Sequence, residues 1–197
     1  MNNAMNTTMK TAMNTPILTT RTLTLACALT LSAFGAHAHA TLEEGDAIAG
    51  SYYKAAVQIG HGCEGTPVHT VVVRLPAGFK GAKPSPKAGW KIDITRAPLA
   101  QPYTSHGRTI TDDVSEIRWT AQSAEAKLQD AWYDTFVLRG QLPAQAGPLW
   151  FKILQVCDKG QVDWAEVPAQ GTSTKGLKEP AALLNVHPAD PHAGHGH

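Results

Sequence analysis

The sequence predicts an all-β protein whose single domain is an antiparallel Greek-key β-sandwich. Short runs rich in Val, Ile, Thr and aromatic residues recur between residues 52 and 167, and clusters of Gly and Pro separate them. About seven such strands with turn signals between them are typical of a β-sandwich. No amphipathic helices separate the runs, which excludes a parallel α/β fold.

The individual strands are expected where apolar and polar side chains alternate. Trp90, Ile92 and Ile94 share one face of their run, which is the period of a half-buried strand. Two prolines predict a loop at residues 80–86, and the acidic pair at 112–113 predicts a turn. Residues 121–130 are the only candidate helix. The expected strands are residues 52–59, 69–75, 90–95, 108–111, 117–120, 133–142, 149–157 and 162–167.

Residues 1–38 have the pattern of a secretory signal peptide. An apolar stretch at 22–35 follows Arg21 and contains no acidic residue, and Ala36 and Ala38 form an A-x-A cleavage signal. The stretch is too short to favour a spanning helix, which needs about 20 apolar residues. Met13 is an alternative start, and cleavage after Ala40 is an alternative to cleavage after Ala38.

Cleavage after Ala38 would make His39 the first residue of the mature protein. Its free α-amine and its imidazole are then two nitrogen donors on one residue, a chelate that suits Cu(II) among the common divalent metals. An α-amine has a reference pKa of about 7.7–8.0 and must lose its proton to bind, so copper binding is expected to weaken below neutral pH. Cleavage after Ala40 would instead expose Thr41 and remove this pair.

Cys63 and Cys157 are the two cysteines beyond the signal segment. An even pair in an exported chain favours a disulfide, and two thiolate copper ligands are the alternative. A bridge between them closes a loop of roughly 100 residues, worth about 4–5 kcal/mol in the chain-entropy model.

Composition limits the partners of the chain. With 17 basic and 16 acidic residues and no basic stripe, nucleic acid is excluded as an expected partner. No further apolar run is long enough for a membrane anchor. Residues 187–197 form a Pro/Gly/His tail that is expected to be disordered and a weak auxiliary metal site. Its histidines are His187, His192, His195 and His197.

Short motifs spread over residues 39–164 match a known family in order, and together they are far more specific than any single one. They include Gly-His-Gly-Cys-Glu-Gly-Thr-Pro at residues 60–67. The matching segments are residues 39–40, 60–67, 74–76, 89–90, 119–120, 133–136, 149–152 and 162–164. With these segments the chain resembles the YcnI-like copper-binding domain family of exported bacterial proteins. The resemblance implies an immunoglobulin- or cupredoxin-like β-sandwich over residues 39–186. It also implies one Cu(II) held by His39 in a single-histidine brace.

In that family a carboxylate completes the brace and a tryptophan lies near the metal. Carried over to this chain, Trp164 is the expected neighbour, with Trp150 as the weaker candidate. Many relatives have Asp-Glu-Phe where this chain has Asp-Thr-Phe, so Thr135 cannot supply the usual charge. Asp134 is the candidate carboxylate ligand in its place, and Glu43 and Glu44 are further candidates.

The function expected from these features is a periplasmic Cu(II)-binding protein that buffers, acquires or delivers copper. Another periplasmic copper carrier or an inner-membrane copper transporter is its expected partner. All four methionines lie at or before Met13, which disfavours a Met-rich Cu(I) carrier. The chain is not expected to be an enzyme.

Two alternatives stay open. A copper-dependent oxidase or monooxygenase would need a second imidazole, from His61, His69 or His106. A metal-free sandwich that binds a protein or glycan would need none of these residues.

Overall fold

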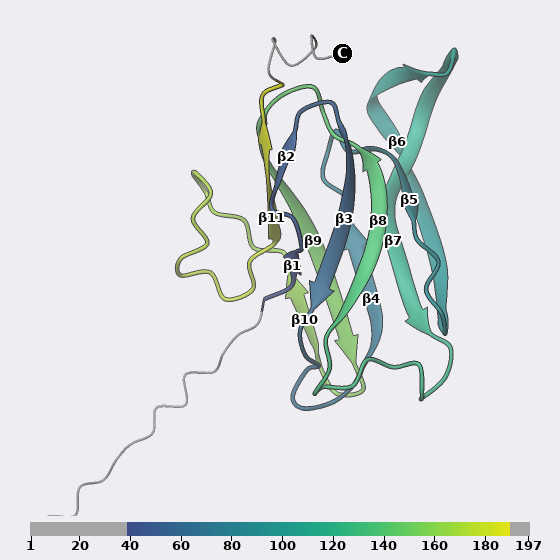
Figure 1. The fold of residues 1–197 in the computed structure, drawn as a ribbon, viewed down its shortest axis with the longest axis vertical. Coiled ribbons are helices and arrows are strands. Elements are labelled where there is room, and N and C mark those ends of the chain that lie inside the picture. Colours follow the sequence, from purple (N-terminus) through teal and green to yellow (C-terminus); the bar gives the residue numbers. More distant parts are fainter. Residues whose placement is uncertain (1–38, 190–197) are drawn as a thin grey trace, which may run out of the picture. The chain divides into compact units, whose positions relative to one another are not determined.

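The computed structural model describes residues 39–189. The regular secondary structure in that range consists of β-strands. Two sheets pack face to face as a sandwich (Figure 1), which confirms the expected fold class. The four-stranded sheet has the order β1 (Thr41–Leu42), β3 (Tyr52–Ile59), β8 (Asp134–Gln141), β5 (Lys80–Pro84). The seven-stranded sheet has the order β2 (Asp46–Ile48), β11 (Ala182–His187), β9 (Gly147–Cys157), β4 (Val68–Arg74), β7 (Arg108–Ala121), β6 (Trp90–Ser105), and β10 (Gln161–Trp164) pairs with β9.

The core lies between the sheets and consists of the inward-facing side chains of alternating strands. Phe136 of β8 is fully buried between two indoles of the opposite sheet. Its ring lies edge-on to Trp90 at 5.0 Å and to Trp119 at 5.7 Å between centroids. Aromatic pairs in this arrangement add about 0.5–1.5 kcal/mol beyond the area that they bury. These contacts hold the two sheets together near the β6–β7 pair.

Several expectations about individual elements were wrong. Residues 108–120 form one continuous strand, and the turn lies instead at His106 and Gly107, which have positive φ values of 47° and 75°. Residues 80–84 form the strand β5, which tolerates Pro84 because β5 lies at a sheet edge. The segment 121–130 is not helical. Its Leu128 pairs with Val68 through two backbone hydrogen bonds, and one buried residue cannot stabilise a short helix.

The C-terminal end of the domain contains a strand that was not expected. β11 was not expected, although Ala182, Leu184 and Val186 alternate inward. The strand pairs antiparallel with β9 and parallel with β2, so the sandwich is not purely antiparallel. His187 belongs to this strand rather than to a tail, and its Nε2 lies 2.6 Å from an Asp46 oxygen. The expected signal segment 1–38 and the tail histidines His192, His195 and His197 lie outside the described residues.

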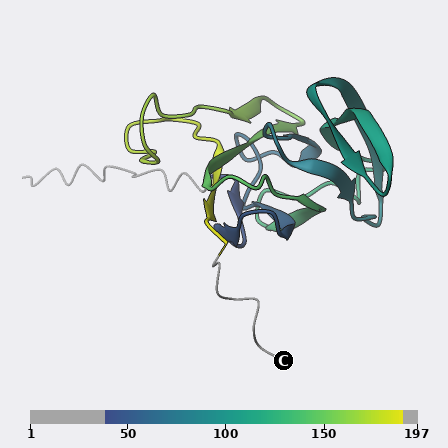
Figure 2. The same ribbon diagram turned by 90° about the horizontal axis from the view of Figure 1, so that it is seen from above.

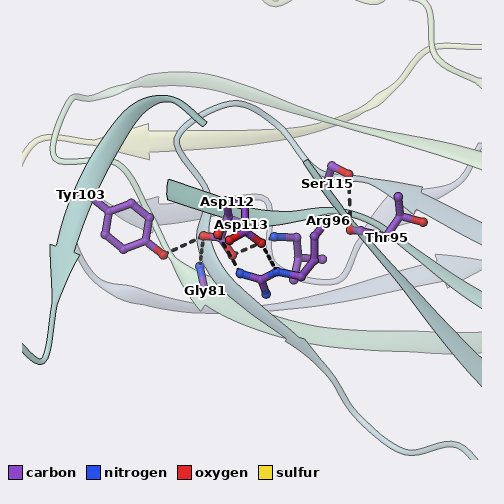
Figure 3. A network of polar contacts seen from close by, with 8 residues as sticks. Gly81, Thr95, Arg96, Tyr103, Asp112, Asp113 and Ser115 are labelled. Carbon is purple, nitrogen blue, oxygen red and sulfur yellow. Dashed lines mark hydrogen bonds and ion pairs between the residues drawn. The ribbon is translucent and has the colours of Figure 1, made fainter. Parts of the chain in front are cut away.

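A buried carboxylate joins the long β6–β7 hairpin to β5. The Asp113 side chain accepts hydrogen bonds from the backbone N–H groups of Gly81 and Val114 and from the Tyr103 hydroxyl, at 2.7–2.8 Å (Figure 3). Burial opposes its charge, but these donors and the charge of Arg96 outweigh burial and lower the pKa of Asp113. Burial, together with the bond to Asp113, raises the pKa of Tyr103 to about 12. Asp113 is therefore a structural anion and not a turn residue.

We predict that Asp113→Asn destabilises the domain by about 1–3 kcal/mol, because an amide nitrogen would face donors that now bind a carboxylate. The neighbouring Asp112→Asn is the control. Its ion pair with Arg96 is half-exposed and should be worth about 0–1 kcal/mol. Urea denaturation at pH 7 measures both, and equal losses in the two variants would contradict this role for Asp113.

Because the folded-state pKa of Asp113 is lowered, its contribution to stability is present above the ordinary aspartate value of about 3.9. That contribution is lost as the pH falls through the lower folded value. The difference in unfolding free energy between wild type and Asp113→Asn should therefore shrink toward acid pH.

Candidate functional site

His39 lies at the start of the described domain, close to Trp164 of β10 and to the beginning of β11. Its neighbour Ala40 is buried in the core, and the following residues pair with β3, so the backbone that precedes β1 is anchored. The His39 ring lies edge-on to the indole of Trp164, with centroids 5.6 Å apart and an interplanar angle of 85°. The structure thus brings together two residues that the sequence singled out, while Trp150 lines a different depression beside Arg74.

A buried amide holds the Trp164 indole in place. Gln155 is 2% exposed and lies on the inward face of β9, between Ile153 and Cys157. Its Oε1 accepts a hydrogen bond from the Trp164 indole N–H at 3.2 Å. Its Nε2 donates to the His61 carbonyl oxygen at 2.6 Å. One side chain therefore links the tryptophan beside His39 to the loop that follows β3.

Two further contacts hold that loop in place. Cys63 forms a disulfide with Cys157 of β9, which confirms the expected bridge. The Gly62 N–H donates to the Asp130 carboxylate at 3.0 Å. A Cβ at position 62 would lie 1.9 Å from the Thr66 carbonyl oxygen, so only glycine fits there. The loop presents the His61 side chain and the Glu64 carboxylate to the same pocket as His39.

The pocket has a volume of about 790 Å³ and is walled on its outer side by the loop between β10 and β11. Glu166 closes the base of this loop, because its carboxylate accepts the N–H groups of Lys178 and Glu179 at 2.7 and 3.0 Å. The pocket is lined by two histidines, one tryptophan and three acidic residues, and also by Lys178 and several uncharged residues. The residues that bear on metal binding are His39, His61, Trp164, Glu64, Asp130 and Glu179.

The tentative carboxylate Asp134 does not line this pocket. It lies at the start of β8, forms an ion pair with Lys87 at 2.6 Å and accepts the Thr135 N–H at 2.7 Å. Glu43 and Glu44, the other candidates, also do not line the pocket, and the Glu44 carbonyl oxygen accepts a hydrogen bond from Tyr53.

Two of the three candidate second imidazoles lie elsewhere. The His69 Nδ1 lies 3.0 Å from the Thr70 hydroxyl, and His106 occupies the β6–β7 turn. Only His61 of the three lines the pocket that holds His39.

Sequence reasoning missed Gln155 and the three wall carboxylates. A signal for Gln155 exists, because a polar residue stands at an inward position of an alternating apolar strand. Glu64 directly follows Cys63 in the matching motif at 60–67. Asp130 and Glu179 come from distant loops, and no local pattern indicates that they reach the pocket.

The donor set fits a chelate based on one residue better than a multi-residue cluster. Among residues 39–189, no three His, Cys, Asp or Glu side chains are grouped to hold a metal ion. In the full chain the His39 nitrogen belongs to the peptide bond with Ala38, so cleavage at that bond would create a second donor beside the imidazole. A carboxylate on the pocket wall could then supply an oxygen ligand.

The two sheets and their disulfide define an immunoglobulin-like β-sandwich protein. A solved structure with this fold, an uncharacterized protein from Nocardia farcinica, has a TM-score of 0.58 and 21% identity, and the match covers 75% of this chain and 97% of the other. The chain belongs to the family described as "Domain of unknown function (DUF1775)", whose model matches residues 39–186.

A second solved structure, described as "Putative membrane anchored protein" from Corynebacterium diphtheriae, has a TM-score of 0.35 and 11% identity. That match covers 76% of this chain and 34% of the other. No curated protein matches the sequence. Over residues 39–189, no helix has the length and apolar character needed to cross a membrane.

We predict that Gln155→Leu destabilises the domain by about 1–3 kcal/mol, because the Trp164 indole N–H loses its buried acceptor. The near-ultraviolet circular dichroism of the indole should change as well. Gln145→Leu in the exposed β8–β9 turn is the control and should stay within about 0.5 kcal/mol of wild type. Wild-type stability and spectrum for Gln155→Leu would show that the amide does not hold the tryptophan.

Proposed function

We propose that the mature protein binds Cu(II) through the α-amine and imidazole of His39. The observation that carries this proposal is the position of His39. It is the first residue of the family match, it follows the expected cleavage site, and its ring lies against Trp164 in a pocket with carboxylates on its wall. The resemblance to YcnI-like domains, which rests on the same residue and on the motif at 60–67, supports the same metal.

The oxygen ligand is a carboxylate of the pocket wall rather than Asp134. Asp134 is already paired with Lys87, whereas Asp130, Glu64 and Glu179 line the same pocket as His39. Asp130 uses one oxygen to accept the Gly62 N–H, which leaves the other oxygen for a ligand. Two nitrogen donors and an oxygen suit Cu(II), and no thioether stands nearby to favour Cu(I).

The proposed cellular role is copper buffering, acquisition or delivery in the periplasm. The Cys63–Cys157 disulfide is typical of proteins outside the reducing cytoplasm. Copper is the cargo, and another periplasmic carrier or an inner-membrane transporter exchanges it with the pocket. The open loop between β10 and β11 forms the outer wall of the pocket and is the surface that such a partner would meet.

A copper-dependent oxidase is the second candidate, favoured by one observation: His61 lines the same pocket as His39. A second imidazole on the metal would make the arrangement a two-histidine brace. Electron paramagnetic resonance of the Cu(II)-loaded protein counts the bound nitrogens. Oxygen consumption with ascorbate tests the activity, and three nitrogens together with turnover would favour the oxidase over the carrier.

We predict that His39→Ala weakens Cu(II) binding by more than about 100-fold, because it removes the imidazole from the chelate. Removing a residue that only hydrogen-bonds to a metal ligand already costs up to about 100-fold in metal affinity. The protein is exported from the full-length gene, and its intact mass fixes the cleavage point. His61→Ala removes an imidazole from the same pocket and serves as the matched control, with less than about tenfold loss expected. A mature chain that begins at Thr41, or wild-type affinity in His39→Ala, would refute the brace. Equal large losses in the two variants would instead indicate the two-histidine brace of the oxidase.

We predict that Cu(II) quenches the fluorescence of Trp164 selectively, because this indole lies against the proposed ligand. In Trp164→Phe most of the copper-dependent quenching should disappear. Trp150→Phe removes an indole on the same sheet but outside the pocket, and it should keep the quenching. The reverse pattern would place the metal away from Trp164.

A further inference from the structure

A cationic pocket lies on the side of the domain opposite to the β10–β11 loop. Figures 1 and 2 show the β6–β7 hairpin on one side and that loop on the other. The pocket has a volume of about 270 Å³ and forms where the hairpin meets the outer face of the four-stranded sheet. Its lining includes Lys80, Lys83, Arg139, His106 and Tyr103, and it contains no carboxylate side chain.

The cations stand opposite one another across three strands. Arg139 of β8 pairs directly with Lys54 of β3 on one side and with Lys83 of β5 on the other. All three residues are exposed. Like charges at directly opposite positions destabilise a sheet. A row of three cations is therefore an unfavourable arrangement for the free protein, and a bound anion would relieve it.

Aromatic rings, rather than acids, hold these cations. The Lys80 Nζ lies 4.9 Å from the centre of the Tyr103 ring, and the Arg139 guanidinium carbon lies 5.1 Å from that of Tyr52. Among residues 39–189, neither these two cations nor Lys54 and Lys83 take part in an ion pair. A ring contact orients a cation without neutralising it.

Asp113 is the acidic residue that is hydrogen-bonded to residues of the pocket lining, and these bonds already occupy its carboxylate. Its carboxylate accepts hydrogen bonds from Tyr103 and Gly81, both of which line the pocket (Figure 3). Its effect is to fix the Tyr103 ring beside Lys80. The chain as a whole has a net charge of only +1, so the concentration of cations here is local.

We propose that this pocket binds a phosphate-type oxyanion, either free phosphate or the phosphate of a lipid headgroup. The Arg139 fork matches two oxygens of such a group, and Lys80 and Lys83 supply point charges around it. The small volume suits a compact anion better than a drug-sized ligand. The site is separate from the His39 pocket and does not depend on copper.

The test is a titration of the mature protein with inorganic phosphate at low ionic strength, followed by the amide NMR signals of Gly81 and Gly140. The variant Lys83→Gln/Arg139→Gln should bind at least about tenfold more weakly. Lys159→Gln/Lys175→Gln removes the same charge from exposed positions outside the pocket and should bind like wild type. Lys83→Gln/Arg139→Gln removes like charges that stand opposite one another, so it should not lower the thermal stability. A weaker affinity for phosphate in this variant would therefore not be due to a folding defect.

A second arm measures flotation with vesicles of phosphatidylglycerol or of phosphatidylcholine. Binding of free phosphate assigns the site to a soluble anion. Binding to phosphatidylglycerol vesicles alone assigns it to a headgroup. Either result supports the proposal when only the Lys83/Arg139 variant loses it. No binding by wild type in either arm, or equal loss in both variants, overturns it.

Discussion

The pocket that holds His39 depends on one buried amide group. Among residues 39–189, Gln155 alone bonds both to the indole of Trp164 and to the backbone of the His61 loop. The bond to the indole is buried, and the bond to His61 is partly buried. A buried polar group is favourable only when its donors and acceptors are satisfied. The position of the Trp164 indole and that of the His61 loop therefore depend on the same side chain. The neighbouring Cys63–Cys157 bridge fixes the same loop to the same strand. The contact between His39 and Trp164 follows from this arrangement.

The strands that could be predicted were those with strong local patterns. The residues of β3 alternate clearly, and its observed bounds are the expected ones. β5 and β11 were missed because an edge strand with Pro84 and a short C-terminal strand interrupted by Asn185 carry weak local signals. The acidic pair at 112–113 was read as a turn because exposed Asp favours turns, whereas tertiary donors make burial of Asp113 favourable.

Among the candidate site residues, the processing signal indicated His39 and the even pair of cysteines indicated Cys63, whereas Trp164 came from the resemblance to a family. The structure places His39 beside Trp164 and bridges Cys63 to Cys157. Two carboxylates of the pocket wall, Asp130 and Glu179, could not be predicted from local sequence, because only the tertiary fold brings them to the pocket. Asp134 shows the converse case. Its motif suggested a ligand, but Lys87 from the loop before β6 lies within ion-pair distance of it.

If the proposed function holds, cleavage during export creates the metal site of this chain. Before cleavage the His39 nitrogen is part of a peptide bond, and its lone pair is delocalised into the carbonyl, so it is a poor donor for a metal at neutral pH. After cleavage the same atom becomes an amine that can coordinate once it is deprotonated. The imidazole alone is a weak ligand, so under this proposal the His39 site has little affinity for copper before cleavage. Under the same proposal, the domain acquires its second nitrogen donor in the compartment where its disulfide forms.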